Sequence, residues 1–426
     1  MTEDYLHHLW KFQAFDRQDL RTVSGEVIEV HHPGYLNRNS GPDFSHARLS
    51  LNGQLWAGSV EIHLQDRDWY QHGHQHDPLY QNVVLHVVYE HKRLVLRNNG
   101  QAIPTLCLKP RIDEASYWRY ERFLQNDKDL ACARLFDQVD SFKIHHMLDR
   151  CLVERFAQRS DRLSEIFAAT GQDWHECFHR WLFYGFGLKV NAEAMLSLAE
   201  RLPWRYLNKL GNSLQSLEAL LLGTAGLLEA AETDSQIAKW RREFTFLQQK
   251  WSLQSMAPAN WRYAKLRPQG FPDRRLGQLA ALYSNEINLF ALLLARAPEK
   301  IEAAFNFRAS AYWHEHFRLG KRSAKASTHV SPGFYQKLLV NVLLPFLFFY
   351  GHQRREQRYK NLAMEWLQNL PAENHRYSRI MSKVGFNNGH AADSQALYHL
   401  YHHYCKPKKC LNCDIGIQLL KNENVG

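Results

Sequence analysis

The spacing of hydrophobic and polar residues changes near residue 113 of the chain. Before that point the apolar residues form short alternating or β-branched runs, which are typical of strands. Beyond it they recur every three or four residues, as on one face of a helix. The change predicts an α+β protein in which a small N-terminal mixed β-sheet domain precedes a large all-α region.

The N-terminal pattern predicts a sheet with one helix before it and one crossover within it. Asn52-Gly53 and Asn99-Gly100 are strong hairpin-turn sequences. The expected order is a helix, three strands, a helical or irregular crossover, a strand and an edge hairpin. These elements are expected at residues 3–15, 25–30, 43–51, 54–64, 68–81, 82–90 and 93–108.

The rest of the chain predicts helices separated by Pro, Gly and polar breaks. Residues 318–333 form the most linker-like stretch, so we expect domains at residues 1–112, 113–320 and 321–426. The expected helices span residues 113–126, 141–170, 173–186, 191–201, 213–231, 234–253, 275–296, 298–306, 334–350, 354–369, 375–383 and 391–404.

Composition narrows the class of protein without indicating a function. Of the 426 residues, 45% are hydrophobic and 23% are charged, which excludes disorder, collagen and coiled coil as descriptions of the whole chain. The longest apolar run, Leu338–Tyr350, is shorter than the roughly 20 residues of a membrane span. The N-terminus has no signal-peptide core, and the seven cysteines are sparse and odd in number. We therefore expect a cytoplasmic protein without membrane association.

Charge is unevenly distributed along the sequence. Residues 1–112 contain 11 Lys or Arg and 12 Asp or Glu, whereas the remainder has a net charge of +11. This excess is compatible with nucleic-acid binding by the helical part, although many soluble proteins are basic without it. Histidine is concentrated at the other end, with 11 of 24 in the first 91 residues.

Three polar residues of the predicted hairpin form the first candidate site. Glu61 and His63 are two apart on a strand and share a face, and hairpin closure brings Asp43 beside them. Two carboxylates and a third polar group suit Mg²⁺ or Mn²⁺. Such an ion would polarise a phosphate and activate water for phosphodiester hydrolysis.

The register of the hairpin decides whether this group forms. A two-residue turn places Asp43 opposite Ile62, on the wrong face, whereas a three-residue turn with Gly53 left-handed places Asp43 opposite His63. The site therefore requires a bulge or a comparable distortion. The alternative is a plain hairpin in which Asp43 caps a turn and Glu61 is solvated.

The same segment resembles the PD-(D/E)XK nuclease superfamily. The resemblance consists of Pro42-Asp43, a 17-residue gap and Glu61-Ile62-His63, together with the order helix, three strands, helix, strand. It implies a metal-dependent nuclease in which Asp43 and Glu61 hold the metal. His63 stands where the superfamily has lysine, and histidine is not a fixed cation at neutral pH.

A second group of histidines and aspartates lies on the crossover and the strand after it. Depending on whether the segment is helical or extended, two or three of its histidines share a face and could ligate Zn²⁺ or Mn²⁺. The alternative is a capped polar loop with a satisfied core histidine, and for His74 this structural interpretation is preferred. The group consists of Asp68, His72, His74, His76, Asp77 and His86.

Nearly the whole chain also resembles a bacterial family of uncharacterised proteins, a domain of unknown function. The matching segments are GPDFSHA (41–47), GSVEIHLQDRDW (58–69), HGHQHDPLYQNVVLHVVYE (72–90), FGLKVNAEAM (186–195), LRPQGFPDRRLGQLA (266–280) and CLNCDIG (410–416). Ser59 departs from the acidic residue expected there. The resemblance supplies no activity, but it implies site roles for Asp43, Glu61, His63, Asp68, Trp69, His72, Asp77 and His86.

The C-terminal candidate site is a group of thiols, Cys405, Cys410 and Cys413, in the spacing C-x4-C-x2-C after His402. A C-x2-C turn suits tetrahedral Zn²⁺. Three thiolates could also serve an iron–sulfur cluster, whose fourth ligand would have to come from elsewhere, such as Cys107 or Cys132. The alternative is three reduced thiols in a C-terminal cap.

The leading hypothesis is a divergent metal-dependent nuclease or nucleic-acid-processing protein. Asp43, Glu61, His63 and His72 would be catalytic, with His63 in the lysine position and His72 a ligand or proton carrier. One alternative is a non-catalytic scaffold that binds nucleic acid or a partner, and another is a hydrolase of small phosphoesters. The candidate metal ligands are Asp43, Glu61, Asp68, His72, Asp77, His86, Cys405, Cys410 and Cys413.

Overall fold

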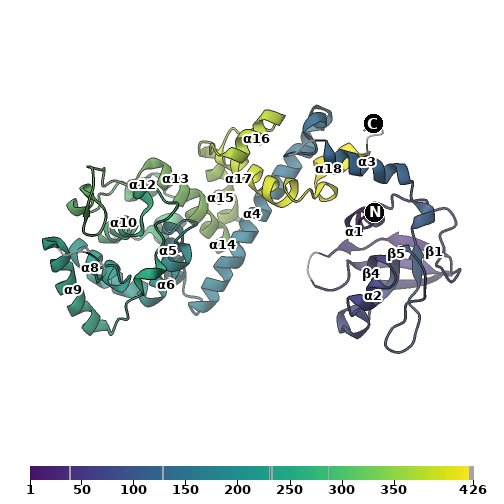
Figure 1. The fold of residues 1–426 in the computed structure, drawn as a ribbon, viewed down its shortest axis with the longest axis horizontal. Helices are drawn as coiled ribbons and strands as arrows, with labels where there is room; N and C mark the ends of the chain where they lie inside the picture. Colours follow the sequence, from purple (N-terminus) through teal and green to yellow (C-terminus); the bar gives the residue numbers. More distant parts are fainter. Residues whose placement is uncertain (38–39, 127–128, 230, 232–233, 286, 422–426) are drawn as a thin grey trace. The chain divides into compact units, whose positions relative to one another are not determined.

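The computed structural model describes residues 1–37, 40–126, 129–229, 231, 234–285 and 287–421 (Figure 1). The chain forms two compact units. The first consists of Met1–Cys151, His375–Asn387 and Leu397–Gly426, and the second of Leu152–Asn374 and Asn388–Ala396. The expected boundary at 112/113 lies inside the first unit, and the one at 320/321 lies inside the second.

The first unit contains a mixed sheet, which confirms the predicted α+β class. Its strands lie in the order β1-β3-β4-β5-β6, and β2 pairs with β3. Pairing is antiparallel as far as β4, whereas β4–β5 and β5–β6 are parallel. The strands are β1 (Ile28–His32), β2 (Tyr35–Leu36), β3 (Phe44–Leu51), β4 (Gln54–Gln65), β5 (Val83–Glu90) and β6 (Thr105–Cys107).

Helix α1 (Glu3–Phe12) and the β4–β5 crossover cover opposite faces of the sheet (Figure 1). The crossover consists of α2 (Asp68–Gln71), η1 (His74–His76) and η2 (Pro78–Tyr80). On the α1 side, Leu6 and Trp10 are buried in one core with Val60 and Ile62 of β4. Because side chains alternate along a strand, the intervening Glu61 lies on the crossover side.

The β3–β4 hairpin has the two-residue turn, and the distortion that the candidate site requires lies within β3. Leu51 pairs with Gln54 across a two-residue turn in which Asn52 and Gly53 both have positive φ. Farther along, Ala47 pairs with Gly58 and Phe44 pairs with Val60, so β3 carries one extra residue. This bulge includes His46, at φ 58°. The extra residue changes the register, so that Asp43 comes opposite Glu61 instead of Ile62.

The predicted edge hairpin over residues 93–108 is wrong in its second half. A single bridge, Leu96 with Ala102, closes the arm around Asn99-Gly100. The segment after Pro104 then turns back to form β6, which pairs parallel with β5. Proline has no N–H for a sheet ladder, which fits the end of the arm at this point.

The rest of the described chain is mainly helical, as predicted, with local differences. The expected helix 275–296 is two helices, α10 and α11, and the expected linker includes the short strands β7 (His316–Arg318) and β8 (Lys321–Arg322). Helices α7 and α18 were not predicted. The bounds are α3 (Glu114–Gln125), α4 (Ser141–Ala169), α5 (Trp174–Phe186), α6 (Ala192–Arg201), α7 (Trp204–Leu210), α8 (Leu214–Thr224), α9 (Ser235–Trp251), α10 (Pro272–Ser284), α11 (Leu289–Leu294), α12 (Pro298–Ala304), α13 (Pro332–Leu338), α14 (Leu344–Gln353), α15 (Gln357–Asn369), α16 (Arg376–Val384), α17 (Ala391–Leu400) and α18 (Asp414–Lys421).

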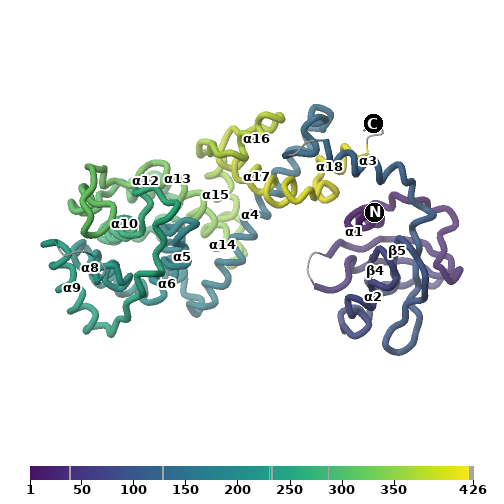
Figure 2. Tube along the Cα trace, viewed as in Figure 1, coloured from purple at the N-terminus to yellow at the C-terminus, as the bar shows by residue number. Residues whose placement is uncertain are grey.

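The C-terminal segment returns to the first unit, where α18 packs on α3 (Figure 2). Leu411 joins the core of the sheet together with Tyr120 of α3. In the second unit, α13, a π-helical turn and α14 form one apolar helix, Pro332–Gln353. By length and composition alone it could cross a membrane, but 61% of its most apolar window is buried, as in the core helix of a soluble protein.

Candidate metal centre

The candidate site lies where β3 and β4 separate beyond the bulge. There the side chain of Asp43 takes the place of a backbone carbonyl in the ladder between the two strands. Its Oδ2 accepts a hydrogen bond of 2.9 Å from the backbone N–H of Ile62. In return, the backbone N–H of Asp43 donates to Glu61 Oε2 at 3.0 Å. These reciprocal bonds fix the two carboxylates beside each other.

Glu61 presents its other oxygen to two imidazoles. His74 Nε2 lies 3.2 Å from Glu61 Oε1, and His63 Nε2 lies 3.4 Å from the same oxygen. Glu61 is 4% exposed and His63 is 1% exposed, so this contact is shielded from water. A buried carboxylate oxygen between two imidazole nitrogens is a geometry suited to a shared cation.

His72 completes a group of three imidazoles. Ligand atoms of His63, His72 and His74 all lie within 4.8 Å of one another, and His72 is the exposed member. The three come from β4, the end of α2 and the start of η1, so the crossover folds over β4 to bring them together. His74 is held by stacking on Tyr80, with ring centroids 3.8 Å apart.

Helix α1 adds a fourth imidazole from the opposite face. Glu3 and His7 are i, i+4 neighbours on one side of α1. His7 Nε2 lies 3.2 Å from Asp43 Oδ2, the oxygen that also accepts from Ile62. Burial lowers the pKa of His7, but the Asp43 carboxylate outweighs it, and the net pKa is raised.

The nitrogen atoms facing these carboxylates lack satisfactory partners. His7 Nε2, His63 Nε2 and His74 Nε2 are buried and make no hydrogen bond of normal geometry with the residues that the structure describes. Buried polar groups in folded proteins are nearly always hydrogen-bonded, and exceptions often mark a functional site or a bound ion. The donor set of imidazole nitrogens and carboxylate oxygens fits a transition metal such as Mn²⁺ or Zn²⁺.

His86 supports the group from the next strand. It pairs with Glu61 in the β4–β5 register, and its Nε2 lies 2.9 Å from His63 Nδ1. A hydrogen bond at the far nitrogen fixes the orientation of an imidazole whose other nitrogen is a ligand. The structure thus places His86 behind His63.

Burial controls the protonation of this core. It raises the pKa of the Glu61 carboxyl, an effect that contact with His74 and the Asp43 N–H partly opposes. Burial also lowers the pKa of His63 to about 2, with neighbouring His86 and His74 adding to the effect. Burial likewise lowers the pKa of His86 to about 3. A neutral His63 cannot replace the fixed charge of a lysine, but it has the protonation state of a metal ligand.

The carboxylates of the crossover have structural contacts. Asp68 Oδ2 accepts from the backbone N–H of Gln65 at 2.9 Å, and Asp77 caps η2 through the N–H of Leu79. Both contacts match the capped-loop interpretation. Asp66, which the sequence did not single out, is 1% exposed and accepts from two backbone N–H groups of the β5–β6 arm.

The structure brings together Asp43, Glu61, His63 and His72, and adds His7 and His74. His7 could have been found from the Glu3/His7 spacing on the polar side of an amphipathic helix. His74 could not be chosen over His76, because the direction of each side chain depends on how η1 packs.

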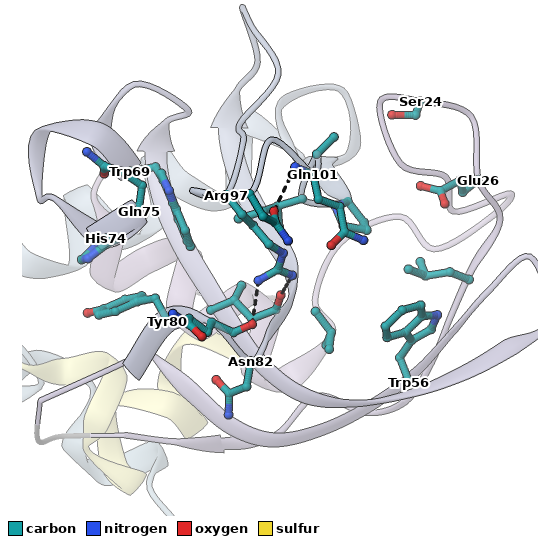
Figure 3. Close-up of a pocket in the computed structure, with 18 of the residues that line it drawn as sticks. Ser24, Glu26, Trp56, Trp69, His74, Gln75, Tyr80, Asn82, Arg97 and Gln101 are labelled. Carbon is teal, nitrogen blue, oxygen red and sulfur yellow. Dashed lines mark hydrogen bonds between the residues drawn. The ribbon is translucent and has the colours of Figure 1, made fainter. Parts of the chain in front are cut away.

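A trough with a volume of about 870 Å³ begins at this site. Trp69, His74 and Tyr80 line its near end, and Trp56 of β4 lines it farther along (Figure 3). The β5–β6 arm supplies another wall through Arg97. A ligand held at His74 could therefore extend into the trough.

The C-terminal thiols also lie in the first unit. The thiol of Cys413 is buried, and its sulfur accepts hydrogen bonds from the backbone N–H groups of Ile415 and Gly416 at the start of α18. Burial raises the pKa of Cys405 well above its ordinary value, and neighbouring Cys413 raises it further. Cys132 and Cys410 contribute in the same sense, so the fold places Cys132 near the three C-terminal cysteines.

Comparison with known proteins yields a family but no activity. Residues 3–376 match the family model described as "Protein of unknown function (DUF2851)". The thiol segment 405–413 lies beyond the matched range. No curated protein and no solved structure matches the chain.

Proposed function

The chain belongs to the DUF2851 family of proteins of unknown function, and from its own residues we propose that it is a divergent metal-dependent phosphodiesterase acting on nucleic acid. The observation that carries this proposal is the convergence of Asp43, Glu61, His63 and His74 where β3 and β4 separate. The order of elements supports it. Apart from the two-residue strand β2, the order is α1, three strands (β1, β3 and β4), α2 and β5, which matches the nuclease superfamily that the sequence resembles.

Each residue of the group has a distinct task. A divalent metal in this group would polarise the phosphate and lower the pKa of a bound water. Asp43 and Glu61 would supply carboxylate oxygens, and His63 and His74 would supply imidazole nitrogens. His72 is exposed and is placed to carry a proton between the site and solvent.

The nitrogen content of the group also selects among metals. Mg²⁺ prefers oxygen ligands and keeps several waters, whereas Mn²⁺ accepts imidazole readily. Of Mg²⁺ and Mn²⁺, the two ions expected for Asp43, Glu61 and His63, Mn²⁺ fits better. We therefore expect Mn²⁺ to support more activity than Mg²⁺ at equal concentration.

The test is cleavage of single- and double-stranded DNA and RNA by the full chain with each metal. Glu61→Gln keeps the size of the side chain but removes its charge, so the rate should fall by about 10³-fold, or ~4 kcal/mol. Glu29→Gln is the control, because Glu29 on β1 accepts a hydrogen bond from the Ser50 hydroxyl and is not one of the proposed metal ligands. A wild-type chain that is inert on every substrate, with no metal-dependent rise in Tm, would leave the scaffold alternative.

We further propose that the C-terminal thiols hold a structural metal. Backbone N–H groups on the Cys413 sulfur and the C-x2-C spacing support this assignment. Anaerobically purified chain should contain about one zinc, or an iron–sulfur chromophore, at this site, and Cys413→Ser should remove it. Cys177→Ser in α5 is the control. Protein without zinc or iron would contradict the proposal.

Nucleic-acid binding by the basic helical part is a separate proposal, supported by the net charge of +11 beyond residue 112. Binding should weaken steeply with salt, because each phosphate contact releases counterions. Titrations of the full chain between about 50 and 200 mM salt measure the slope. If the affinity does not change with salt, the excess positive charge serves solubility and not nucleic-acid binding.

A further inference from the structure

The trough beside the metal centre has a lining that is unusual for a phosphate-binding surface. Among its polar side chains amides are the most numerous, and they include Gln75, Gln81 and Asn82. Apart from His74, Glu26 and Arg97 are the only residues of its described lining whose side chains belong to the acidic or basic types Asp, Glu, Lys, Arg and His. The Arg97 guanidinium donates to the backbone carbonyls of Gln81 and Val83, so this cation is already engaged (Figure 3).

Aromatic rings stand at both ends of the trough. Tyr80 stacks on His74 at the metal centre, and Trp56 is 39% exposed at the other end (Figure 3). Flat apolar faces between amide donors and acceptors suit a neutral, planar ligand with polar edges. A nucleobase has this chemistry, whereas a phosphate does not.

Two polar atoms near the metal centre point to a missing ligand. Trp69 is 1% exposed, and its indole N–H has no hydrogen-bond partner in the described part of the chain. The side-chain oxygen of Gln75 is likewise buried without a partner. A donor and an acceptor left open in the lining of one trough are the groups that a base edge would satisfy.

We propose that the trough binds the unpaired bases of a single-stranded nucleic acid, next to the phosphate held at the metal centre. This inference rests on the proposed function and names its substrate class. In a duplex the bases stack on each other and pair along their edges, so neither faces nor edges are available to the trough. A single strand offers both, with Trp56 and Tyr80 as stacking platforms.

Binding without catalysis tests the trough. Full chain in EDTA is titrated by fluorescence anisotropy with a labelled thymidine oligonucleotide, the same oligonucleotide made abasic, and a duplex. The thymidine strand should bind about 5- to 100-fold more tightly than the abasic strand, the range for stacking of one base. Trp56→Ala should remove this difference.

Trp118→Ala is the matched control. Trp118 lies on α3, is 61% exposed and does not line the trough, so its removal should leave binding unchanged. Asn82→Ala removes one exposed amide of the lining. It should weaken binding of the thymidine strand and leave binding of the abasic strand unchanged.

Three outcomes overturn the inference. The thymidine and abasic strands could bind equally, or the duplex could bind more tightly than the thymidine strand. The third outcome is that the chain binds a neutral oligosaccharide but not the thymidine oligonucleotide. Because no metal is present, the outcome is independent of cleavage. An inert chain that still discriminates bases would refute the phosphodiesterase, whereas cleavage without discrimination would refute only the trough.

Discussion

Two fully buried histidines, one in each unit, show how differently the chain uses the same side chain. In α5, His179 Nδ1 lies 2.7 Å from the hydroxyl of Tyr283, and its Nε2 lies 2.8 Å from the carbonyl oxygen of Leu202. His63 in β4 has one nitrogen bonded to His86, while the other faces Glu61 without a normal hydrogen bond.

Burial lowers the pKa of both residues, to about 3 for His179 and about 2 for His63, so neither is charged at neutral pH. The difference therefore lies in their partners. His179 is saturated and holds two helices together. His63 keeps a neutral nitrogen open toward a carboxylate, which is the arrangement of a ligand. Satisfaction of the nitrogens separates a structural histidine from a functional one.

The largest effect is expected when an open nitrogen is removed. His74→Ala deletes a nitrogen 3.2 Å from Glu61 Oε1. The affinity for Mn²⁺ should fall on the order of 10³-fold, beyond the 10- to 100-fold typical of an outer-shell residue. Calorimetric titration with Mn²⁺ measures this loss, and the fold should persist because His74 is only partly buried.

His91→Ala is the control for that experiment. His91 Nδ1 lies 3.1 Å from the buried Asp66 carboxylate and, like His74 Nε2, makes no hydrogen bond of normal geometry among the described residues, so the pair resembles His74 and Glu61. Asp66, however, accepts backbone N–H groups of Lys92 and Arg93. Mn²⁺ affinity should be unchanged in this variant. Equal losses in both variants would show that the metal does not distinguish the Glu61 group from a carboxylate that backbone N–H groups already engage.

His179→Ala should do the opposite. It leaves the Tyr283 hydroxyl and the Leu202 carbonyl without their partner and opens a cavity in the helical core. The cost should be about 3 kcal/mol of folding free energy. Chemical denaturation measures it, and Mn²⁺ affinity should stay at the wild-type level. A variant of normal stability would show that saturation contributes little here.

Much of the site followed from the sequence because it depends on local rules. Alternation along a strand placed Glu61 and His63 on one face, and the Asn52-Gly53 turn predicted the hairpin that returns Asp43. The bulge at His46 was beyond such rules, because both sides of the ladder must be known before an extra residue on one side becomes visible.

The remaining members depend on packing between distant segments. His7 reaches Asp43 only because α1 packs against β4, and His74 rather than His76 turns inward because of how η1 packs on Tyr80. The aspartates of the crossover have the residue type of metal ligands, but short-range backbone bonds engage Asp68 and Asp77. Residue type alone does not separate a cap from a ligand.

Glu218 extends the comparison to buried carboxylates. Its Oε1 accepts from Ser310 Oγ and Trp313 Nε1, each at 2.7 Å. Burial nevertheless raises its pKa from 4.5 to about 7. An acid with a raised folded-state pKa contributes its full stability below pH 4.5 and loses it as the pH rises through about 7.

The loss should amount to about 3 kcal/mol between these pH values. Glu218→Gln cannot titrate, so its unfolding free energy should fall less than that of the wild type over the same range. Urea denaturation at several pH values gives the difference between the two slopes. Parallel curves would mean that Glu218 is ionised throughout and fully compensated by its partners.

The smallest effect is expected at His72, the exposed member of the metal group. Its nitrogen lies within 4.8 Å of those of His63 and His74, but water can replace it as a ligand. His72→Ala should therefore weaken Mn²⁺ binding by only about 10-fold, or ~1.4 kcal/mol, without affecting stability. His76→Ala is the matched control, since His76 is also exposed and lies outside the group.

If His72 carries a proton as well as binding metal, cleavage at saturating Mn²⁺ should remain slow in His72→Ala and normal in His76→Ala. Full recovery at saturating metal would limit His72 to the role of a ligand.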